Sequence, residues 1–232
     1  QIFLEDRQKY GPDSDKTFSD DEILDEFAIF YIAGKDTTST LLAMMLYCYC
    51  KYPEWAKKVE QEIQETIHKT PNLTIEAINS MDILTAFIKE VLRYYPPAPG
   101  ILPRRAIKDH KIGDIMIKKG TILFPTFIAN HFNPRFFENP NEFNPERWLN
   151  SDKSNEGWKN ETYAYLPFPA GPRNCIGQHL AIIEAKTIMA IIVNGYDIQI
   201  DGDYELKMLT GGGSVGYHPK DIPLILSPKS NK

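Results

Sequence analysis

The chain has 232 residues, of which 42% are hydrophobic and 25% are charged, and its formal net charge is −5 at pH 7. This length allows one large domain or two small ones, each with a real core, while the acidic balance excludes a broad basic surface for nucleic acid. Only three cysteines occur, so the sequence does not predict a secreted disulfide framework and favours an intracellular, reducing setting.

No stretch of the sequence is predicted to cross a membrane or to act as a signal peptide. Gln1–Ser19 is polar and charged, unlike a secretory signal. The most apolar stretch, Phe27–Cys50, carries Lys35, Asp36 and several hydroxyl side chains near its middle. A charge at the bilayer centre costs roughly 2.5–3.5 kcal/mol, so we interpret this stretch as part of a long buried helix.

Hydrophobic periodicity and capping residues predict a mainly helical chain. Ser19 or Asp20 is predicted to start the long helix, because acidic residues fill its first turn, and Pro53 follows its end. Thr74 is a candidate cap for a further short element. The main helices are predicted over Asp20–Tyr52, Pro53–Lys69, Ile83–Tyr95 and Gln178–Val193.

The centre of the long helix, Ala33–Thr40, is a poor helix former. A glycine and several hydroxyl side chains predict a bend or an opened hydrogen-bond ladder there. One interpretation is a tolerated polar face. The other is the floor of a groove, in which Gly34 admits a ligand and Thr37 offers it a hydroxyl.

Short strands and irregular segments are predicted between and after the helices. Asn133–Trp148 combines three Asn-Pro pairs with many aromatics, which predicts a packed meander, and the polar Ser151–Asn160 is predicted to be a mobile loop. The sequence thus predicts a mainly α fold with small β-sheets and no domain boundary within residues 1–232. The remaining predictions are strands at Ile101–Ile107, Ile112–Ile117 and Thr121–Phe124, a hairpin turn at Lys118–Gly120, a strand at Tyr196–Ile200, a flexible turn at Gly211–Ser214 and a terminal hairpin closed by Ile222–Leu226.

Cys175 lies in a loop rich in glycine and proline, Phe168–Gly177, directly before a predicted helix. Free amide N–H groups and the helix dipole favour a thiolate at such a position. The thiolate could be a metal ligand or a nucleophile, and an inert buried thiol is the simpler alternative. His179 could share a zinc site with Cys175, but no second ligand pair is apparent, and no other histidine has the context of a Cys–His hydrolase.

Four motifs stand in one order along the chain: Ala33-Gly34-x-Asp36-Thr37-Thr38, Glu90-x-x-Arg93, Phe143-x-Pro145-x-Arg147-Trp148, and Phe168-x-x-Gly171-x-Arg173-x-Cys175-x-Gly177. In composition and order they resemble the cytochrome P450 family of heme-thiolate monooxygenases. The resemblance covers only the C-terminal, heme-binding half of that fold. It implies a long central helix, an ionic-triad helix, a meander, a cysteine loop and a proximal helix.

The resemblance implies roles for the residues of the cysteine loop. Cys175 would be the thiolate ligand of the iron in heme b, iron protoporphyrin IX, where it pushes electron density that favours O–O cleavage. Gly171 and Gly177 would let the backbone lie flat against the macrocycle, and Ala181 would keep the following helix close. Phe168 would pack beside the sulfur and shield it from solvent.

Other residues are implied to contact the heme propionates or to hold the fold together. Arg173 and Arg104 resemble propionate partners, with Arg105 as a competitor of Arg104. His131 matches a histidine near the propionates, with a surface histidine as the alternative. Glu90, Arg93 and Arg147 resemble an ionic triad that would lock the meander. The alternative for Glu90 and Arg93 is a surface ion pair.

On the distal side, the resemblance implies that Ala33 and Gly34 lie against the heme. Asp36 and Thr37 resemble the catalytic acid–alcohol pair, in which Thr37 hydrogen-bonds O₂ and Asp36 feeds protons through solvent. The implied reaction inserts one oxygen atom of O₂ into a lipophilic organic substrate. Walls for this substrate are expected at Phe27–Ala33, Ala98–Leu102 and Leu209–Ser214.

An NADPH-linked reductase is the implied electron donor, docking near Arg173 and Lys186. The implied location is intracellular, at the endoplasmic reticulum membrane, with membrane contact only through an N-terminal part that this chain lacks. Alternatives are a peroxygenase or isomerase, against which the Asp36–Thr37 pair argues, and a truncated non-catalytic chain with poor heme retention.

Overall fold

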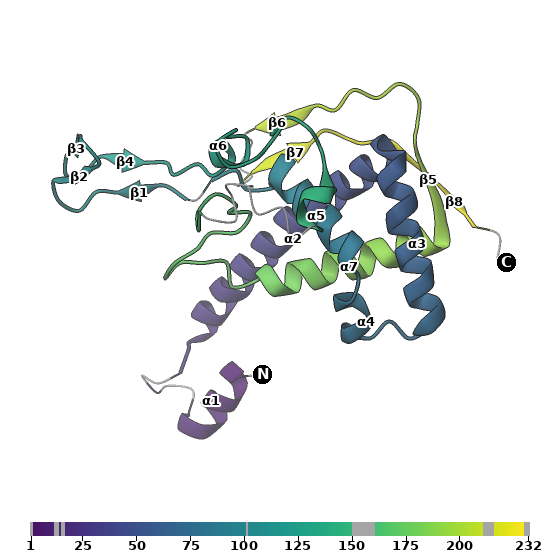
Figure 1. Cartoon of the computed structure of the whole chain (residues 1–232). Coiled ribbons are helices and arrows are strands. Elements are labelled where there is room, and N and C mark those ends of the chain that lie inside the picture. The colour runs from purple at the N-terminus through teal and green to yellow at the C-terminus, as the bar shows by residue number, and fades with distance from the viewer. Residues whose placement is uncertain are drawn as a thin grey trace. The chain divides into compact units, whose positions relative to one another are not determined.

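The structure is a computed structural model (Figure 1) that describes residues 2–11, 14, 17–100, 102–149, 161–210 and 216–229. The chain divides into two compact units, Gln1–Thr37 and Thr38–Lys232, and each is described by itself. The predicted loop Ser151–Asn160 and the predicted turn Gly211–Ser214 lie outside the described residues.

The first unit contains helix α1, Ile2–Tyr10, and the first part of helix α2, Asp20–Lys51. The predicted start of α2 is confirmed by a reciprocal cap. The Glu22 N–H donates to Ser19 Oγ (3.3 Å), while the Ser19 N–H and Oγ donate to Glu22 Oε2 (2.8 and 2.9 Å). The hydrogen bond from the Ser19 backbone lowers the pKa of Glu22.

Helix α2 runs through its polar centre without interruption, so the expected opening of its ladder is wrong. The hydroxyl of Thr37 donates to the Ala33 carbonyl one turn earlier (2.7 Å). This back-bonding satisfies the side chain inside a continuous helix. Within the described residues, no helix is long and apolar enough to cross a membrane.

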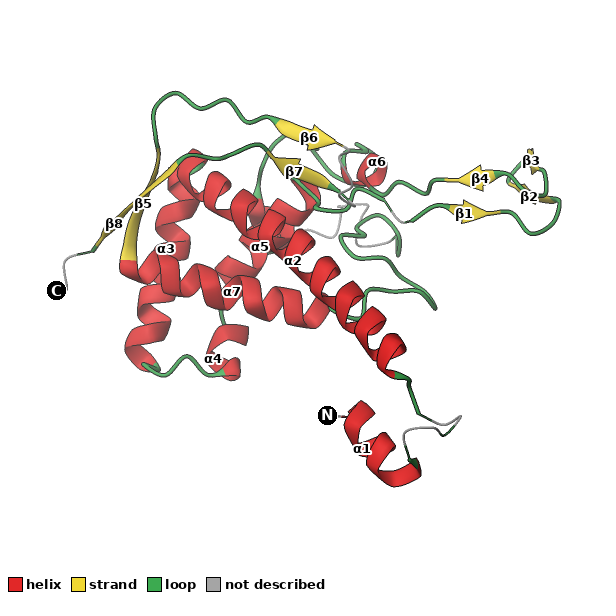
Figure 2. Cartoon of the chain, turned by 180° about the vertical axis from the view of Figure 1, so that it is seen from behind, coloured by secondary structure: helices red, strands yellow, loops and turns green. Residues whose placement is uncertain are grey.

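The core of the second unit lies between the rest of α2 and the helices that follow it (Figure 2). Met44 of α2, Val59 of α3, Phe87 of α5 and Met189 of α7 are all fully buried. Burying one such side chain contributes about 1.5–3 kcal/mol. The helices are α3, Pro53–Lys69; α4, Ile75–Asn79; α5, Asp82–Tyr94; and α7, Gln178–Gly195.

The ends of these helices agree with the predictions because their signals are local. Pro53 stands in the first turn of α3, and the Thr74 side chain accepts a hydrogen bond from the Ala77 N–H (3.2 Å) at the start of α4. Helix α5 has a cap that the sequence did not predict. Both carboxylate oxygens of Glu62, on α3, accept from the N–H groups of Ile83 and Leu84, each at 2.8 Å.

The predicted sheet after α5 is present, but its pairing differs from the prediction. The hairpin turn lies at Gly113-Asp114, with Gly113 at φ +57°, and not at Lys118–Gly120. A turn does occur at Lys118–Gly120, but the strands on its two sides pair with different partners. The strands are β1, Arg104–Arg105, paired with β4, Ile122–Leu123; and β2, His110–Ile112, paired with β3, Ile115–Ile117.

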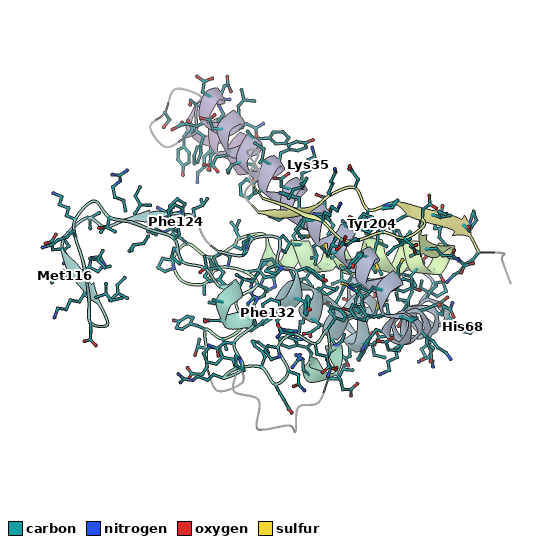
Figure 3. All side chains as sticks on the ribbon, turned by 90° about the horizontal axis from the view of Figure 1, so that it is seen from above. Lys35, His68, Met116, Phe124, Phe132 and Tyr204 are labelled. Carbon is teal, nitrogen blue, oxygen red and sulfur yellow. The ribbon has the colours of Figure 1, made fainter. Side chains whose placement is uncertain are left out.

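These four strands stand away from the helices of the second unit (Figure 1). Their apolar side chains are accordingly exposed: Met116 on β3 is 50% exposed and Phe124, just after β4, is 67% exposed (Figure 3).

The predicted meander is confirmed as packed and mostly irregular. Its regular piece is the 3₁₀ helix η1, Pro145–Trp148, whose N-cap Asn144 accepts from the Glu146 N–H (3.0 Å). Helix α6, Ile128–His131, precedes the meander. Phe137 and Phe143 are buried within the meander.

The last four strands form two antiparallel pairs, and the second pair lies between the two strands of the first pair in sequence. Strand β5, Tyr196–Ile200, pairs antiparallel with β8, Leu224–Pro228. Between them in sequence, β6, Met208–Thr210, pairs with β7, Tyr217–Pro219. The predicted closing strand therefore exists two residues later than expected, and it pairs with β5 and not with its nearest neighbour in sequence.

Candidate functional site

The cysteine loop is shaped by its own backbone hydrogen bonds. The Asn174 N–H donates to the Gly171 carbonyl (3.1 Å), and the Cys175 N–H donates to the Pro169 carbonyl (3.4 Å). Gly171 has a φ of +92°, a conformation that side-chain-bearing residues rarely adopt. The Cys175 thiol is therefore held at a fixed place just before Gly177, which is the N-cap of α7.

Cys175 is half-buried, and the surface around it is a mixture of cationic and apolar groups. Arg173 is exposed, while Ile176 and Leu180 are 80% and 68% exposed, respectively. Ala181 follows on the first turn of α7, where its N–H donates to the Gly177 carbonyl (2.9 Å). The loop thus presents a thiol, an arginine and apolar side chains on adjoining positions.

Phe168 opens the loop and is half-buried, with its ring packed against the core of the second unit. A Cβ added at Gly177 would lie 4.0 Å from the Cys175 sulfur, an ordinary contact distance. The loop is therefore fixed to the core at its first residue and joined to α7 at its last.

Glu90 forms the centre of a buried ionic cluster, which we define as Glu90, Arg93 and Arg147. The side chains of Glu90 and Arg93 are fully buried, which excludes the surface-pair interpretation. Arg93 donates to both oxygens of Glu90 (2.8 and 2.9 Å), and Arg147 Nε donates to Glu90 Oε1 (3.2 Å). The predicted triad is thus present as a bonded group.

Arg93 also reaches helix α6 and the meander. Its guanidinium donates to the carbonyls of His131 (2.8 Å), Pro140 (2.8 Å) and Glu142 (2.9 Å). Together with the two bonds to Glu90, these use all five N–H donors of the guanidinium. The cluster therefore joins α5 to the meander through satisfied hydrogen bonds.

Two further donors to Glu90 were missed by the sequence analysis. The indole Nε1 of Trp148 donates to Glu90 Oε2 (2.9 Å), and the Asn144 N–H donates to Glu90 Oε1 (2.8 Å). Trp148 stands next to Arg147 in the motif, so the sequence could have indicated its indole as a donor to Glu90. Nothing local in the sequence indicates the backbone donor.

His131 has a different environment from either expectation. It is fully buried, so the surface alternative is wrong. Its Nδ1 bonds to the Arg93 carbonyl (3.2 Å) and its Nε2 accepts from the Leu166 N–H (3.0 Å). Both ring nitrogens are thereby used, so the imidazole has no N–H left for a propionate in this arrangement. In this structure His131 joins α6 to α5 and to the segment before the cysteine loop.

The protonation of His131 follows from this burial. Burial lowers its pKa to about 4, and the nearby charge of Arg93 acts in the same direction. The ring is therefore neutral at physiological pH, with the proton on Nδ1, as the acceptor role of Nε2 requires.

Arg104 and Arg105 make up strand β1, and both are exposed. Arg104 Nη1 donates to the Leu102 carbonyl (2.9 Å), which leaves other guanidinium N–H groups for a second partner. Neighbouring residues of a strand point to opposite faces, so only one of the two arginines can face a given ligand.

The proposed distal residues lie in the first unit. Asp36 and Thr37 are half-buried, while Ala33 and Gly34 are exposed. The Thr37 hydroxyl is directed at the Ala33 carbonyl, as described above. A Cβ added at Gly34 would meet no described atom within 4 Å, so packing in this structure does not require a glycine there.

Lys186 was expected on the surface that a reductase contacts, and this is wrong. Only 4% of Lys186 is exposed, and its Nζ donates to the Ile78 carbonyl at the end of α4 (3.2 Å). Burial lowers its pKa. Lys186 therefore holds α7 against α4.

The donor set fits a heme better than a bare metal ion. Within the described residues, no group of three or more His, Cys, Asp or Glu side chains could hold a metal. A single thiol beside an arginine and exposed apolar groups suits a planar cofactor that brings its own nitrogen ligands. Such a cofactor would need from the protein one axial sulfur, cations for its carboxylates and apolar contacts.

Comparison with known proteins agrees with the motifs. The family model described as Cytochrome P450 matches residues 1–226. The chain is 38% identical to a cytokinin hydroxylase of Arabidopsis thaliana, over 78% of this chain and 34% of that protein. It is 33% identical to cytochrome P450 3A25 of Mus musculus, over 86% of this chain and 39% of that protein.

A solved structure extends the likeness to three dimensions. The cytochrome P450DA heme domain superposes with a TM-score of 0.82 at 26% identity, covering 99% of this chain and 53% of that one. The chain thus spans about half of this heme domain and well under half of the two curated relatives.

Proposed function

Because the chain belongs to the cytochrome P450 family, we propose that it is the heme-ligating part of a heme-thiolate monooxygenase in which Cys175 binds the iron. One observation carries this proposal: the half-buried thiol of Cys175 in a loop fixed by the left-handed Gly171, directly before helix α7. The N-terminus of a helix favours the anionic form of a thiol, which is the form that binds iron.

Heme b, when bound, supplies the reductive activation of O₂ that the reaction needs. The protein holds it non-covalently except at Cys175. Arg173 and Arg104, which are both exposed, donate to the propionates as charge-assisted partners. Gly171, Gly177 and Ala181 present little side chain and let the backbone approach the ring, while Phe168 shields the sulfur.

Thr37 and Asp36 supply the proton chemistry. The Thr37 hydroxyl donates to Ala33 in this structure, and a rotation about its χ1 angle frees it to hold a proton on the distal side. Asp36, half-buried beside it, exchanges protons with solvent. The pair supports use of O₂ over the peroxygenase or isomerase alternatives.

The substrate class is a lipophilic organic molecule that receives one oxygen atom. Several relatives are named as hydroxylases, among them the steroid 17-alpha-hydroxylase/17,20 lyase of Felis catus, which is 34% identical over 86% of this chain and 39% of that protein. Electrons come from an NADPH-linked reductase that docks near the cysteine loop, in the neighbourhood of Arg173. The likeness to the mouse cytochrome P450 3A25 supports our proposal that the whole protein works at the endoplasmic reticulum membrane.

The test is the spectrum of the reduced, CO-treated protein, prepared as the complete polypeptide with heme. We expect the red-shifted Soret band of a thiolate-ligated heme in the wild type and its loss in Cys175→Ser. Cys50→Ser is the matched control, since the Cys50 sulfur is half-buried and, among the described residues, bonds only to the Ile198 carbonyl (3.7 Å). An unshifted band in the wild type, or a shifted band in Cys175→Ser, would contradict the proposal.

A second measurement addresses the reaction type. We expect Thr37→Ala to consume NADPH with much less product than the wild type, because proton delivery then fails. Thr85→Val is the control for loss of a helix hydroxyl, since among the described residues the Thr85 hydroxyl bonds only to the carbonyl of Met81, the N-cap of α5 (2.5 Å). Unchanged coupling in Thr37→Ala would remove Thr37 from the mechanism.

A further inference from the structure

One hydrogen bond joins two segments that lie far apart in the sequence. The Oγ1 of Thr40 and the Nδ1 of His218 are 2.6 Å apart. Thr40 is on α2, less than one helical turn after Thr37, and only 2% of it is exposed. His218 is the central residue of β7. The bond therefore connects the hairpin β6–β7 to α2 inside the second unit.

The residue before this strand, Gly216, is closely packed against a second segment. A Cβ added at Gly216 would lie 1.8 Å from the carbonyl oxygen of Pro97, so no side chain fits there. Pro97 belongs to the segment after α5. That segment is itself fixed, because the Pro99 carbonyl accepts from the N–H groups of Phe127 (2.8 Å) and Ile128 (3.1 Å). Strand β7 is thus bonded to α2 through His218, and the residue before it packs closely against the segment after α5.

The fixed strand determines where one apolar side chain lies. His218 pairs directly with Leu209 of β6. Directly paired residues of antiparallel strands project from the same face of the sheet, so Leu209 shares the face that His218 presents to α2. Leu209 is 51% exposed, so its side chain is available to a ligand. It is also the first residue of one predicted substrate wall.

We propose, on the basis of the monooxygenase function above, that His218 is a positioning residue for substrate selection. Its bond to Thr40 fixes the hairpin β6–β7 and thereby the place of Leu209 against the substrate. Leu209 makes the contact, and His218 acts through it. Loss of the bond frees the hairpin and changes which ligands fit, while heme ligation by Cys175 is unaffected.

The variants that test this separate the hydrogen bond from the size of the side chain. Thr40→Val and His218→Leu remove the bond with little change of volume. Thr40→Ser keeps the hydroxyl, and His218→Asn keeps a hydrogen-bonding atom close to the position of Nδ1. The matched control is Thr85→Val, in which the lost hydroxyl makes a local bond to the N-cap of its own helix.

Two measurements on the complete heme-loaded protein give the answer. The first is hydrogen exchange at the backbone amides of β6 and β7. The second is the ratio of the dissociation constants for imidazole and 4-phenylimidazole, each followed by its change of the Soret band. Imidazole reports on the heme iron alone, and the added phenyl ring reports on the surrounding walls.

In Thr40→Val and His218→Leu we expect exchange in β6 and β7 to accelerate about fivefold, the size of one net hydrogen bond. The ratio of the two dissociation constants should change by a similar factor, while imidazole binding alone stays as in the wild type. Thr40→Ser, His218→Asn and Thr85→Val should resemble the wild type. The effects of Thr40→Val and His218→Leu should be less than additive in the double variant, because both substitutions remove the same bond.

A ratio that stays within twofold of the wild type in both bond-removing variants would overturn the proposal. So would an equal change in Thr85→Val. Failure of the monooxygenase function is distinguishable, because it would appear as a wild-type protein without the thiolate band in its CO spectrum. The exchange measurement would then still decide whether the Thr40–His218 bond fixes the hairpin.

Discussion

The ionic cluster of Glu90, Arg93 and Arg147 and the cysteine loop Phe168–Gly177 carry opposite kinds of interaction. The cluster is buried, and its charges and donors find partners within the protein. The loop is held mainly by short-range backbone bonds and leaves Arg173 and Ile176 exposed. The polar groups of the ionic cluster bond to other residues of the protein, whereas the cysteine loop presents exposed groups that suit a ligand.

This difference predicts that stability depends mainly on the ionic cluster and heme binding mainly on the cysteine loop. Changes in the ionic cluster should alter the free energy of unfolding, because they leave buried charge without a partner. Changes in the exposed part of the cysteine loop should alter heme binding and leave the fold nearly intact. The comparison would be wrong if changes in the ionic cluster left stability unchanged, or if changes in the exposed part of the cysteine loop unfolded the protein.

The largest effect on stability is expected from Glu90→Gln. It keeps the shape but leaves Arg93 and Arg147 buried without their counter-charge, which costs about 3–5 kcal/mol. Urea denaturation followed by circular dichroism measures it. The control Glu138→Gln changes an exposed carboxylate of the same meander and should cost less than about 0.5 kcal/mol. Equal losses of unfolding free energy in the two variants would show that the buried charge of Glu90 contributes no more to stability than an exposed carboxylate.

Acid should weaken the same region through His131. Its pKa falls from 6.5 to about 4 on folding, so between these values the unfolded chain binds a proton that the folded chain does not. Stability is therefore lost as the pH falls from about 6.5 to 4, by about 3 kcal/mol in total. Unfolding free energies of wild type and His131→Gln across this range isolate the effect from carboxylate titration. Parallel curves for the two proteins would count against it.

A smaller loss is expected from Trp148→Phe, which removes one donor from Glu90 (2.9 Å). A hydrogen bond to a charged group contributes about 1.5–3 kcal/mol, so we expect a loss of about 2 kcal/mol. The same substitution in a Glu90→Gln background should cost less, because the charged acceptor is already gone. Additive losses would show that the indole stabilises the meander by packing alone.

The smallest effect on the fold is expected from Arg173→Ala. Arg173 is exposed, so the free energy of unfolding should change by less than about 0.5 kcal/mol. Heme should nevertheless leave the protein faster, because a propionate partner is lost. Transfer of heme to an acceptor apoprotein measures the rate, with Lys229→Ala as a cationic control that instead breaks an ion pair with Glu60. An unchanged rate would remove Arg173 from the heme contacts.

The helices could be predicted from the sequence because their ends are set by neighbours in the chain. The box of Ser19 and Glu22, the proline at 53 and the Thr74 cap all act within a few residues. The order of the four motifs likewise indicated the family. Such signals need no knowledge of the fold.

The short strands and the buried polar groups could not be predicted in the same way. Strands of two or three residues depend on distant partners, and the alternating run Ile112–Ile117 concealed the Gly113-Asp114 turn, although that dipeptide is itself a hairpin signal. The environments of His131 and Lys186 are set by groups 38 and 108 residues away. Only the folded chain shows that these two side chains are buried.

The spacing of Glu90 and Arg93 has a consequence for the order in which the protein assembles. The two are one turn apart on α5, so their charges can pair as soon as that helix forms. Arg147 and the meander carbonyls lie 47 to 57 residues away in sequence from the charges they contact. We therefore expect the meander to dock late, onto a pair that is already neutral, so that Arg147→Met speeds unfolding and leaves the refolding rate almost unchanged. Slower refolding of that variant in stopped-flow measurements would place the meander in the folding nucleus instead.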